Sequence, residues 1–95
     1  MKPLIKAAIW EYTLPLSTEM VEHQMCPDAS VVNIGWHPRY GPPIIAIYVR
    51  VFTEVTQREK RCFVIRGTGS EYDPDWKYLG AVSNGGFIWH VLECT

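Results

Sequence analysis

The sequence of 95 residues has no long apolar run and no excess of charge of either sign. Its longest uninterrupted apolar segment, Ile44 to Val49, is about six residues, whereas a helix that spans a membrane needs about 20. Nine basic side chains stand against ten acidic ones. The sequence therefore predicts no membrane partner and no nonspecific binding to nucleic acid, because no basic field attracts phosphate groups.

Cysteine is also scarce, and its count is odd. The three cysteines are Cys26, Cys62 and Cys94, and no N-terminal stretch has the apolar core and cleavage site of a signal peptide. We therefore expect reduced, unpaired thiols in a reducing compartment. The length suits one hydrophobic core, so residues 1–95 are expected to form a single domain.

The third absence is helical periodicity, since no apolar stripe of helical spacing lasts for three turns. Short runs rich in β-branched and aromatic residues recur instead, bounded by turn residues. They predict six or seven strands, with a short helix at 17–19 as an alternative. The expected fold class is all-β, an antiparallel meander that forms a small sandwich or a partly closed barrel. The expected strands cover residues 8–14, 20–25, 30–36, 44–52, 58–66, 78–82 and 87–94.

Three pairing predictions follow from the turns between these runs. The near-continuous apolar segment Ile44–Phe52 is typical of a central strand or of one that faces a partner subunit. We expect it to pair with the strand at 58–66 through the turn at 53–57. Residues 26–29 predict a hairpin into the next strand, and Asn84-Gly85-Gly86 predicts another before the last strand.

The sequence contains no complete set of catalytic or metal-binding residues. There is no serine nucleophile elbow, and Cys62 and Cys94 lie within apolar strands, where thiols are usually inert. His23 and Cys26 have the spacing of half a zinc site, and no second half follows. His90 is expected to be a hydrogen-bonded histidine of the sheet. These observations predict no enzymatic activity, no cofactor and no metal.

Two groups of residues are candidates for binding. Arg66 precedes Gly67-Thr68-Gly69, and successive backbone N–H groups beside an arginine can hold a phosphate. The segment lacks the lysine and the helix of a phosphate-binding loop, so a turn that ends the strand is the alternative. The second group is an aromatic patch, because Trp and Tyr are enriched where proteins bind one another. Its candidate members are Trp36, Tyr40, Tyr72 and Trp76.

Three segments in order carry a family resemblance. They are Ile9–Pro15, Phe63–Gly69, and Tyr78–Gly80 together with Gly85–Val91. Over most of the chain this ordered set resembles a family of short bacteriophage-encoded proteins without assigned function, and residues 31–57 diverge from it. The resemblance implies a phage accessory protein that acts inside an infected bacterium, and it supplies no catalytic residues.

These features lead to two functional expectations. The first is a non-enzymatic protein in the host bacterial cytoplasm that binds and blocks a host protein, such as a component of antiviral defence. The alternative is a protein that sequesters a small phosphorylated or nucleotide-like signal through Arg66 and its neighbours, with Trp76 as an aromatic wall. A homodimer is also expected, because the apolar strand at 44–51 and a small core both gain from a second subunit.

Overall fold

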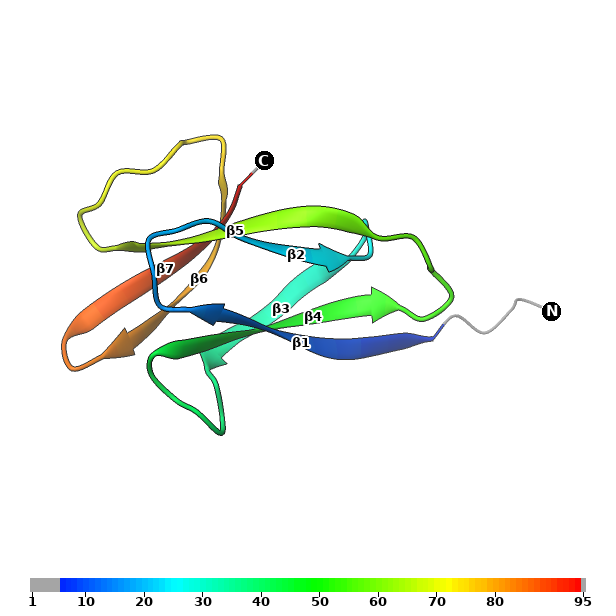
Figure 1. The fold of residues 1–95 in the computed structure, drawn as a ribbon, viewed down its shortest axis with the longest axis horizontal. Helices are drawn as coiled ribbons and strands as arrows, with labels where there is room; N and C mark the ends of the chain where they lie inside the picture. The colour runs from blue at the N-terminus through cyan, green and yellow to red at the C-terminus, as the bar shows by residue number, and fades with distance from the viewer. Residues whose placement is uncertain (1–5, 95) are drawn as a thin grey trace.

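The computed structural model describes residues 6–94, which form seven antiparallel strands in two sheets (Figure 1). The predicted all-β class is confirmed, and the sheets form a sandwich that is not closed into a barrel. Over the described range there is no helix that could cross a membrane, and residues 17–19 form bends. The strands are β1 (Ala7–Pro15), β2 (Val21–Met25), β3 (Ser30–Trp36), β4 (Ile44–Phe52), β5 (Glu59–Gly67), β6 (Lys77–Asn84) and β7 (Phe87–Cys94).

Sheet A has the strand order β1-β4-β3, and sheet B has the order β2-β5-β7-β6. The core lies between them, and β4 is the central strand of sheet A, as its apolar sequence predicts. Every second residue of β4 points into the core, namely Ile45, Ile47, Val49 and Val51, and each is fully buried. Sheet B therefore covers the apolar face of β4 within one chain.

The predicted pairing of β4 with β5 is wrong, because these strands belong to different sheets. Their connection, residues 53–58, crosses from sheet A to sheet B instead of closing a hairpin. Val55 packs against the core from this connection, and its carbonyl oxygen accepts a hydrogen bond from Arg58 Nη1 at 3.4 Å. Partial burial of Val55 and the arginine contact thus favour the crossing over a surface turn.

The predicted hairpin across residues 26–29 is also wrong, although the turn itself forms. The N–H of Ala29 donates to the carbonyl oxygen of Cys26 at 3.0 Å, and both residues are buried. The turn leads from β2 in sheet B to β3 in sheet A, so it joins the sheets. Among the strands of residues 6–94, only β3–β4 and β6–β7 are hydrogen-bonded pairs of consecutive strands, so the order is not that of a simple meander.

The hairpin between β6 and β7 is confirmed. Asn84 lies opposite Phe87, which leaves Gly85 and Gly86 as a two-residue turn. Their φ values of 58° and 86° both lie in the left-handed region, as a type I′ turn requires.

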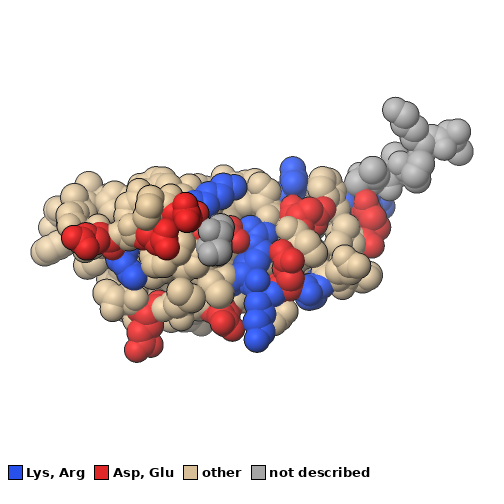
Figure 2. Space-filling view, turned by 90° about the horizontal axis from the view of Figure 1, so that it is seen from above, with Lys and Arg blue, Asp and Glu red and all other residues tan. Residues whose placement is uncertain are grey.

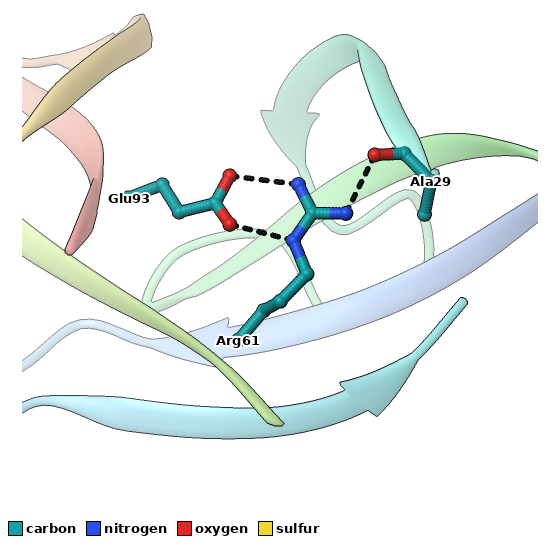
Figure 3. A network of polar contacts seen from close by, with 3 residues as sticks. All are labelled: Ala29, Arg61 and Glu93. Carbon is teal, nitrogen blue, oxygen red and sulfur yellow. Dashed lines mark hydrogen bonds and ion pairs between the residues drawn. The ribbon is translucent and has the colours of Figure 1, made fainter. Parts of the chain in front are cut away.

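A charged network joins β5, β7 and the turn before β3 (Figure 3). Arg61 Nε and Nη2 donate to the two carboxylate oxygens of Glu93 at 2.6 and 2.8 Å, and Nη1 donates to the carbonyl oxygen of Ala29 at 2.6 Å. Trp36 supplies a second link between the sheets, since its Nε1 donates to the carbonyl oxygen of Ser83 at 2.9 Å.

Candidate functional site

A small pocket lies on the outer face of sheet B. Val64 and Leu92 alternate with core residues along β5 and β7, so their side chains point away from sheet A, yet both are buried. The long loop at 68–76 runs beside this face (Figure 1). The pocket has a volume of about 180 Å³ and is lined by Arg66, Gly67, Thr68, Gly69, Ser70, Tyr72, Tyr78, His90 and Leu92. The predicted segment 66–69 therefore does line a cavity.

A β-bulge in β6 brings Tyr78 to this pocket. Gly80 lies opposite Val91 and Tyr78 lies opposite Leu92, so Leu79 has no partner residue. The extra residue reverses which sheet face the side chains before it point to. Tyr78 therefore lies on the outer face, while Leu79 packs against the core. A Cβ atom at Gly80 would lie 3.2 Å from Ile34 Cδ1, so the close approach of β3 favours glycine here.

His90 holds two hydroxyl groups at the centre of the pocket. Its Nε2 lies 2.8 Å from Thr68 Oγ1 and its Nδ1 lies 2.8 Å from the hydroxyl oxygen of Tyr78. A neutral imidazole satisfies both, because one nitrogen donates and the other accepts. The prediction of a hydrogen-bonded sheet histidine is confirmed, and the contacts fix the positions of both hydroxyls.

Arg66 is committed to structural contacts. Its Nη1 donates to the carbonyl oxygens of Thr18 and Ile65, each at 3.0 Å. Its guanidinium carbon lies 5.6 Å from the ring centroid of Trp76, within the range of a cation–π contact. Arg66 therefore joins the end of β5 to the loop after β1 and to the residue before β6.

The backbone donors predicted to form an anion site are partly occupied. The N–H of Thr68 donates to the carbonyl oxygen of Ile88 at 3.3 Å, and the N–H of Ser70 donates to that of Gly67 at 3.0 Å. The segment thus forms the strand-ending turn that was the alternative reading of its sequence, and fewer N–H groups are left for a ligand.

The structure divides the predicted aromatic patch. Tyr72 lines the pocket and Trp76 lies beside Arg66. Trp36 is half-buried against the core, where its ring nitrogen bonds to Ser83. Tyr40 lies in the connection between β3 and β4, stacked on His37 with ring centroids 4.7 Å apart. Trp36 and Tyr40 therefore do not line the pocket that contains Tyr72.

A second hollow adjoins the pocket at the tip of the β6–β7 hairpin. It is lined by Gly67, Thr68, Gly86, Phe87, Ile88 and Trp89, so the two hollows share Gly67 and Thr68. We call the surface around both hollows the tip surface, defined by Thr68, Tyr72, Tyr78, Phe87, Ile88 and His90. Sequence reasoning left Tyr78, Phe87, Ile88 and His90 out of the candidate site, although Tyr78 belongs to the surplus of aromatic residues from which the patch was drawn. Three consecutive apolar residues after the Gly-Gly turn were the available signal, since in a strand they cannot all face the core.

The cysteines and the remaining histidines have other contacts. Cys26 is buried, and its Sγ accepts from Arg58 Nη1 at 3.0 Å. Burial raises the pKa of the Cys62 and Cys94 thiols, which is opposite to the shift that activates a nucleophile. His23 Nε2 donates to the carbonyl oxygen of Thr13 at 2.8 Å. Among residues 6–94 no three His, Cys, Asp or Glu side chains converge as metal ligands.

The charges form no broad field of one sign on the face shown in Figure 2. Acidic and basic side chains alternate over much of this view, in keeping with the near-zero net charge.

No curated protein and no solved structure matches the chain. A sequence family described as a domain of unknown function, DUF7352, matches residues 5–95. Because the match spans nearly the whole chain, the protein belongs to the DUF7352 family.

Proposed function

We propose that this chain is a non-enzymatic protein that binds another protein and blocks part of its surface, using the tip surface as the contact. The observation that carries the proposal is the exposure of large side chains there. Tyr72, Tyr78, Phe87 and Ile88 are 49%, 51%, 67% and 45% exposed. Exposed apolar and aromatic side chains around adjoining hollows are typical of sites that bind a protein partner.

Contacts within the tip surface support the same function. His90 holds Thr68 and Tyr78 through hydrogen bonds of 2.8 Å, and Phe87 stacks on Trp89 at an interplanar angle of 17°. Side chains that are already ordered lose less conformational entropy when a partner binds. The contacts of Thr68, Tyr78 and Phe87 thus favour binding through side chains that are already positioned.

The proposed partner is a host protein in the cytoplasm of an infected bacterium, with a component of antiviral defence as the target class. This part rests on the resemblance to short bacteriophage-encoded proteins. Two of the segments that carry the resemblance, Phe63–Gly69 and Gly85–Val91, contribute Thr68, Phe87 and Ile88 to the tip surface.

A small phosphorylated or nucleotide-like ligand is the second candidate, because Arg66, Thr68 and Tyr72 line one pocket as that function requires. The pocket volume of about 180 Å³ is below the range of roughly 300–1,000 Å³ that is usual for small-molecule sites, and the adjoining hollow of about 430 Å³ is lined by neither Arg66 nor Tyr72. Arg66 Nη1 and two backbone N–H groups also have protein partners. These facts favour the protein partner.

Affinity capture from bacterial lysate tests the leading function. The wild-type chain is compared with a double variant, Phe87→Ser with Ile88→Ser, and with Val32→Ser, an equally exposed apolar residue on β3. We expect the tip variant to lose a specifically captured protein that wild type and Val32→Ser retain, with all three proteins equally folded by circular dichroism. Retention of the same protein by the tip variant would contradict the proposal.

Calorimetric titration with cyclic and linear nucleotides tests the second candidate. If the chain does not sequester a nucleotide and Arg66 only joins structural elements, we expect the wild type to bind none of these nucleotides. Arg66→Ala should then lower the free energy of unfolding by about 1–2 kcal/mol through lost hydrogen bonds. Saturable binding by the wild type that Arg66→Ala loses would establish sequestration in place of the leading function.

A further inference from the structure

The outer edge of β1 presents backbone groups that have no partner strand. At the two ends of the β1–β4 ladder, Thr53 N–H donates to Lys6 O at 3.0 Å and Leu16 N–H donates to Pro43 O at 2.8 Å. Hydrogen-bonded pairs alternate along an antiparallel ladder, so the even-numbered residues of β1 bond to β4. The N–H and C=O groups of the odd-numbered residues therefore point away from β4, outward from the edge of sheet A.

Part of this edge is covered and part is open. Near its C-terminal end, the carbonyl oxygen of Thr13 accepts a hydrogen bond from His23, and Pro15 has no N–H group. Within the described residues, no backbone group pairs with the outward N–H and C=O of Ile9 or Glu11. Ile9 is 58% exposed and Trp10 is 43% exposed. The open part of the edge thus carries large apolar side chains.

Over Ala7 to Tyr12, β1 has little of what keeps edge strands from pairing, since Pro15 and the His23 contact lie beyond this stretch. Its register with β4 is unbroken over nine residues, and Glu11 is its one charged residue. Charged side chains, proline, bulges, short length and cover by another element are the usual protections. Of the other edge strands, β2 has five residues, and β3 and β6 are bulged and lie beside each other, with Ile34 against Gly80. The N-terminal half of β1 lies below β4 in Figure 1, at the lower margin of that side of the molecule.

We propose that β1 pairs in antiparallel fashion with β1 of a second copy of this chain, about a two-fold axis at Ile9. The two three-stranded sheets A then become one continuous sheet. In this register Ile9 lies opposite its symmetry equivalent, and Ala7 lies opposite Glu11 of the second copy. All three residues belong to the outward-pointing set, so each contributes to the new ladder.

The side chains of β1 around this axis are complementary to those of β1 in a second copy, which favours a second copy as the partner. Trp10 falls opposite Ala8 of the second copy, so a large side chain meets a small one. The two Glu11 carboxylates are not opposite each other, and each already has His37 Nε2 at 2.9 Å within its own chain. The pairing therefore places no like charges face to face.

The location differs from the one that the sequence suggests. The apolar strand β4 was expected to drive dimerisation, yet its core-facing residues are covered by sheet B of the same chain. The apolar surface that remains exposed on sheet A includes Ile9 at the β1 edge and part of Trp10, whose ring centroid lies 5.4 Å from the guanidinium carbon of Arg58.

Substitutions at Ile9 separate the backbone from the side chain. Ile9→Pro removes an outward N–H and leaves the bonds to β4 intact, since that N–H does not face β4. Ile9→Lys retains the backbone and puts two like charges at the two-fold axis. Ile9→Val is the matched control, because it keeps the N–H group and a β-branched apolar side chain.

Sedimentation over a range of micromolar concentrations measures the outcome. We expect a wild-type dimer that Ile9→Val retains and that Ile9→Pro and Ile9→Lys each weaken roughly 10- to 100-fold. Circular dichroism verifies that each variant is folded, and the lysine variant keeps the test valid if the proline variant unfolds. In amide exchange, the N–H groups of Ile9 and Glu11 should be protected in the dimer and unprotected in Ile9→Lys.

Three outcomes would overturn the proposal. A wild-type monomer at all concentrations would leave the edge to a strand of a different protein. A dimer that survives both disruptive variants would place the interface on another surface. A dimer in which the Ile9 and Glu11 amides exchange freely would exclude pairing through β1.

Discussion

Arg61 places a positive charge where three segments of the sandwich meet. Its side chain and that of Glu93 are each 12% exposed, so both groups are largely removed from water. Such burial costs free energy that only well-formed hydrogen bonds offset. The bidentate contact with Glu93 and the bond to Ala29 provide these bonds, so loss of either partner leaves a buried charge without compensation.

We predict that Arg61→Met or Glu93→Met alone lowers the free energy of unfolding by about 2 kcal/mol, because each leaves one uncompensated charge that is only partly exposed to water. The double variant should recover much of this loss, since both charges are then gone. Urea denaturation of the four proteins gives the coupling energy directly. Additive losses in the double variant would show that the pair is not coupled.

Cys62 and Cys94 face each other across β5 and β7. Burial is the main cause that raises the pKa of both thiols, and the nearby Glu22 carboxylate raises that of Cys62 further. A folded-state pKa above the unfolded value means that the folded protein holds these protons more tightly. The resulting stability is present at neutral pH and is lost as the pH rises past the ordinary thiol pKa of about 8.5.

We therefore predict that alkylation of Cys62 by iodoacetamide begins at higher pH than alkylation of a free thiol. Glu22→Gln should shift the onset for Cys62 to lower pH and leave Cys94 nearly unchanged. Peptide mass spectrometry after timed alkylation measures both sites in one sample. An equal shift at both cysteines would instead indicate a general loosening of sheet B.

The strands as elements are predictable because their cause is local. β-branched and aromatic runs that end at Gly, Pro, Asn or Asp mark β3, β4 and β7 with the bounds that the structure has. Partner choice is not local. The connections at 26–29 and 53–58 have lengths that suit either a hairpin or a crossing between sheets, and burial of Cys26 and Ala29 and partial burial of Val55 decide for the crossing.

The tip surface was hidden from sequence reasoning for a related cause. A continuous register from the Gly85-Gly86 turn would place Tyr78 opposite Glu93, on the core side. The bulge at Leu79 moves it opposite Leu92 and beside His90. This choice depends on Ile34, which packs against Gly80 from another sheet. Arg66 to Gly69 were found because they are contiguous, whereas Tyr78 and His90 meet only after folding.

The turn of the β6–β7 hairpin leads to a prediction at this scale. Gly86→Ala should lower the free energy of unfolding by about 1 kcal/mol, because its φ of 86° is strained for a residue with a Cβ atom. Gly85→Asn should have little effect, since Asn-Gly is a favoured type I′ pair. Thermal unfolding of both variants tests this. Equal losses would mean that the turn is not type I′ in solution.

Across the whole molecule, strands close in sequence are placed in different sheets. The chain passes between the sheets after β1, β2 and β4, so each sheet pairs distant segments. Ala7 pairs with Phe52 in sheet A, and Val21 pairs with Phe63 in sheet B. The strands of each sheet are joined through strands of the other sheet, and the two sheets share one core. We therefore expect neither sheet to form without the other.

This interleaving predicts one cooperative unfolding transition and slow refolding, in milliseconds to seconds, as is usual for non-local β topologies. β4 and β5 belong to different sheets. In native-state amide exchange their core amides should nevertheless open with the same free energy, because both sheets form one cooperative unit. The unfolding transitions followed by tryptophan fluorescence and by circular dichroism should coincide. A difference of more than about 1 kcal/mol between the β4 and β5 amides would show instead that one sheet persists after the other has unfolded.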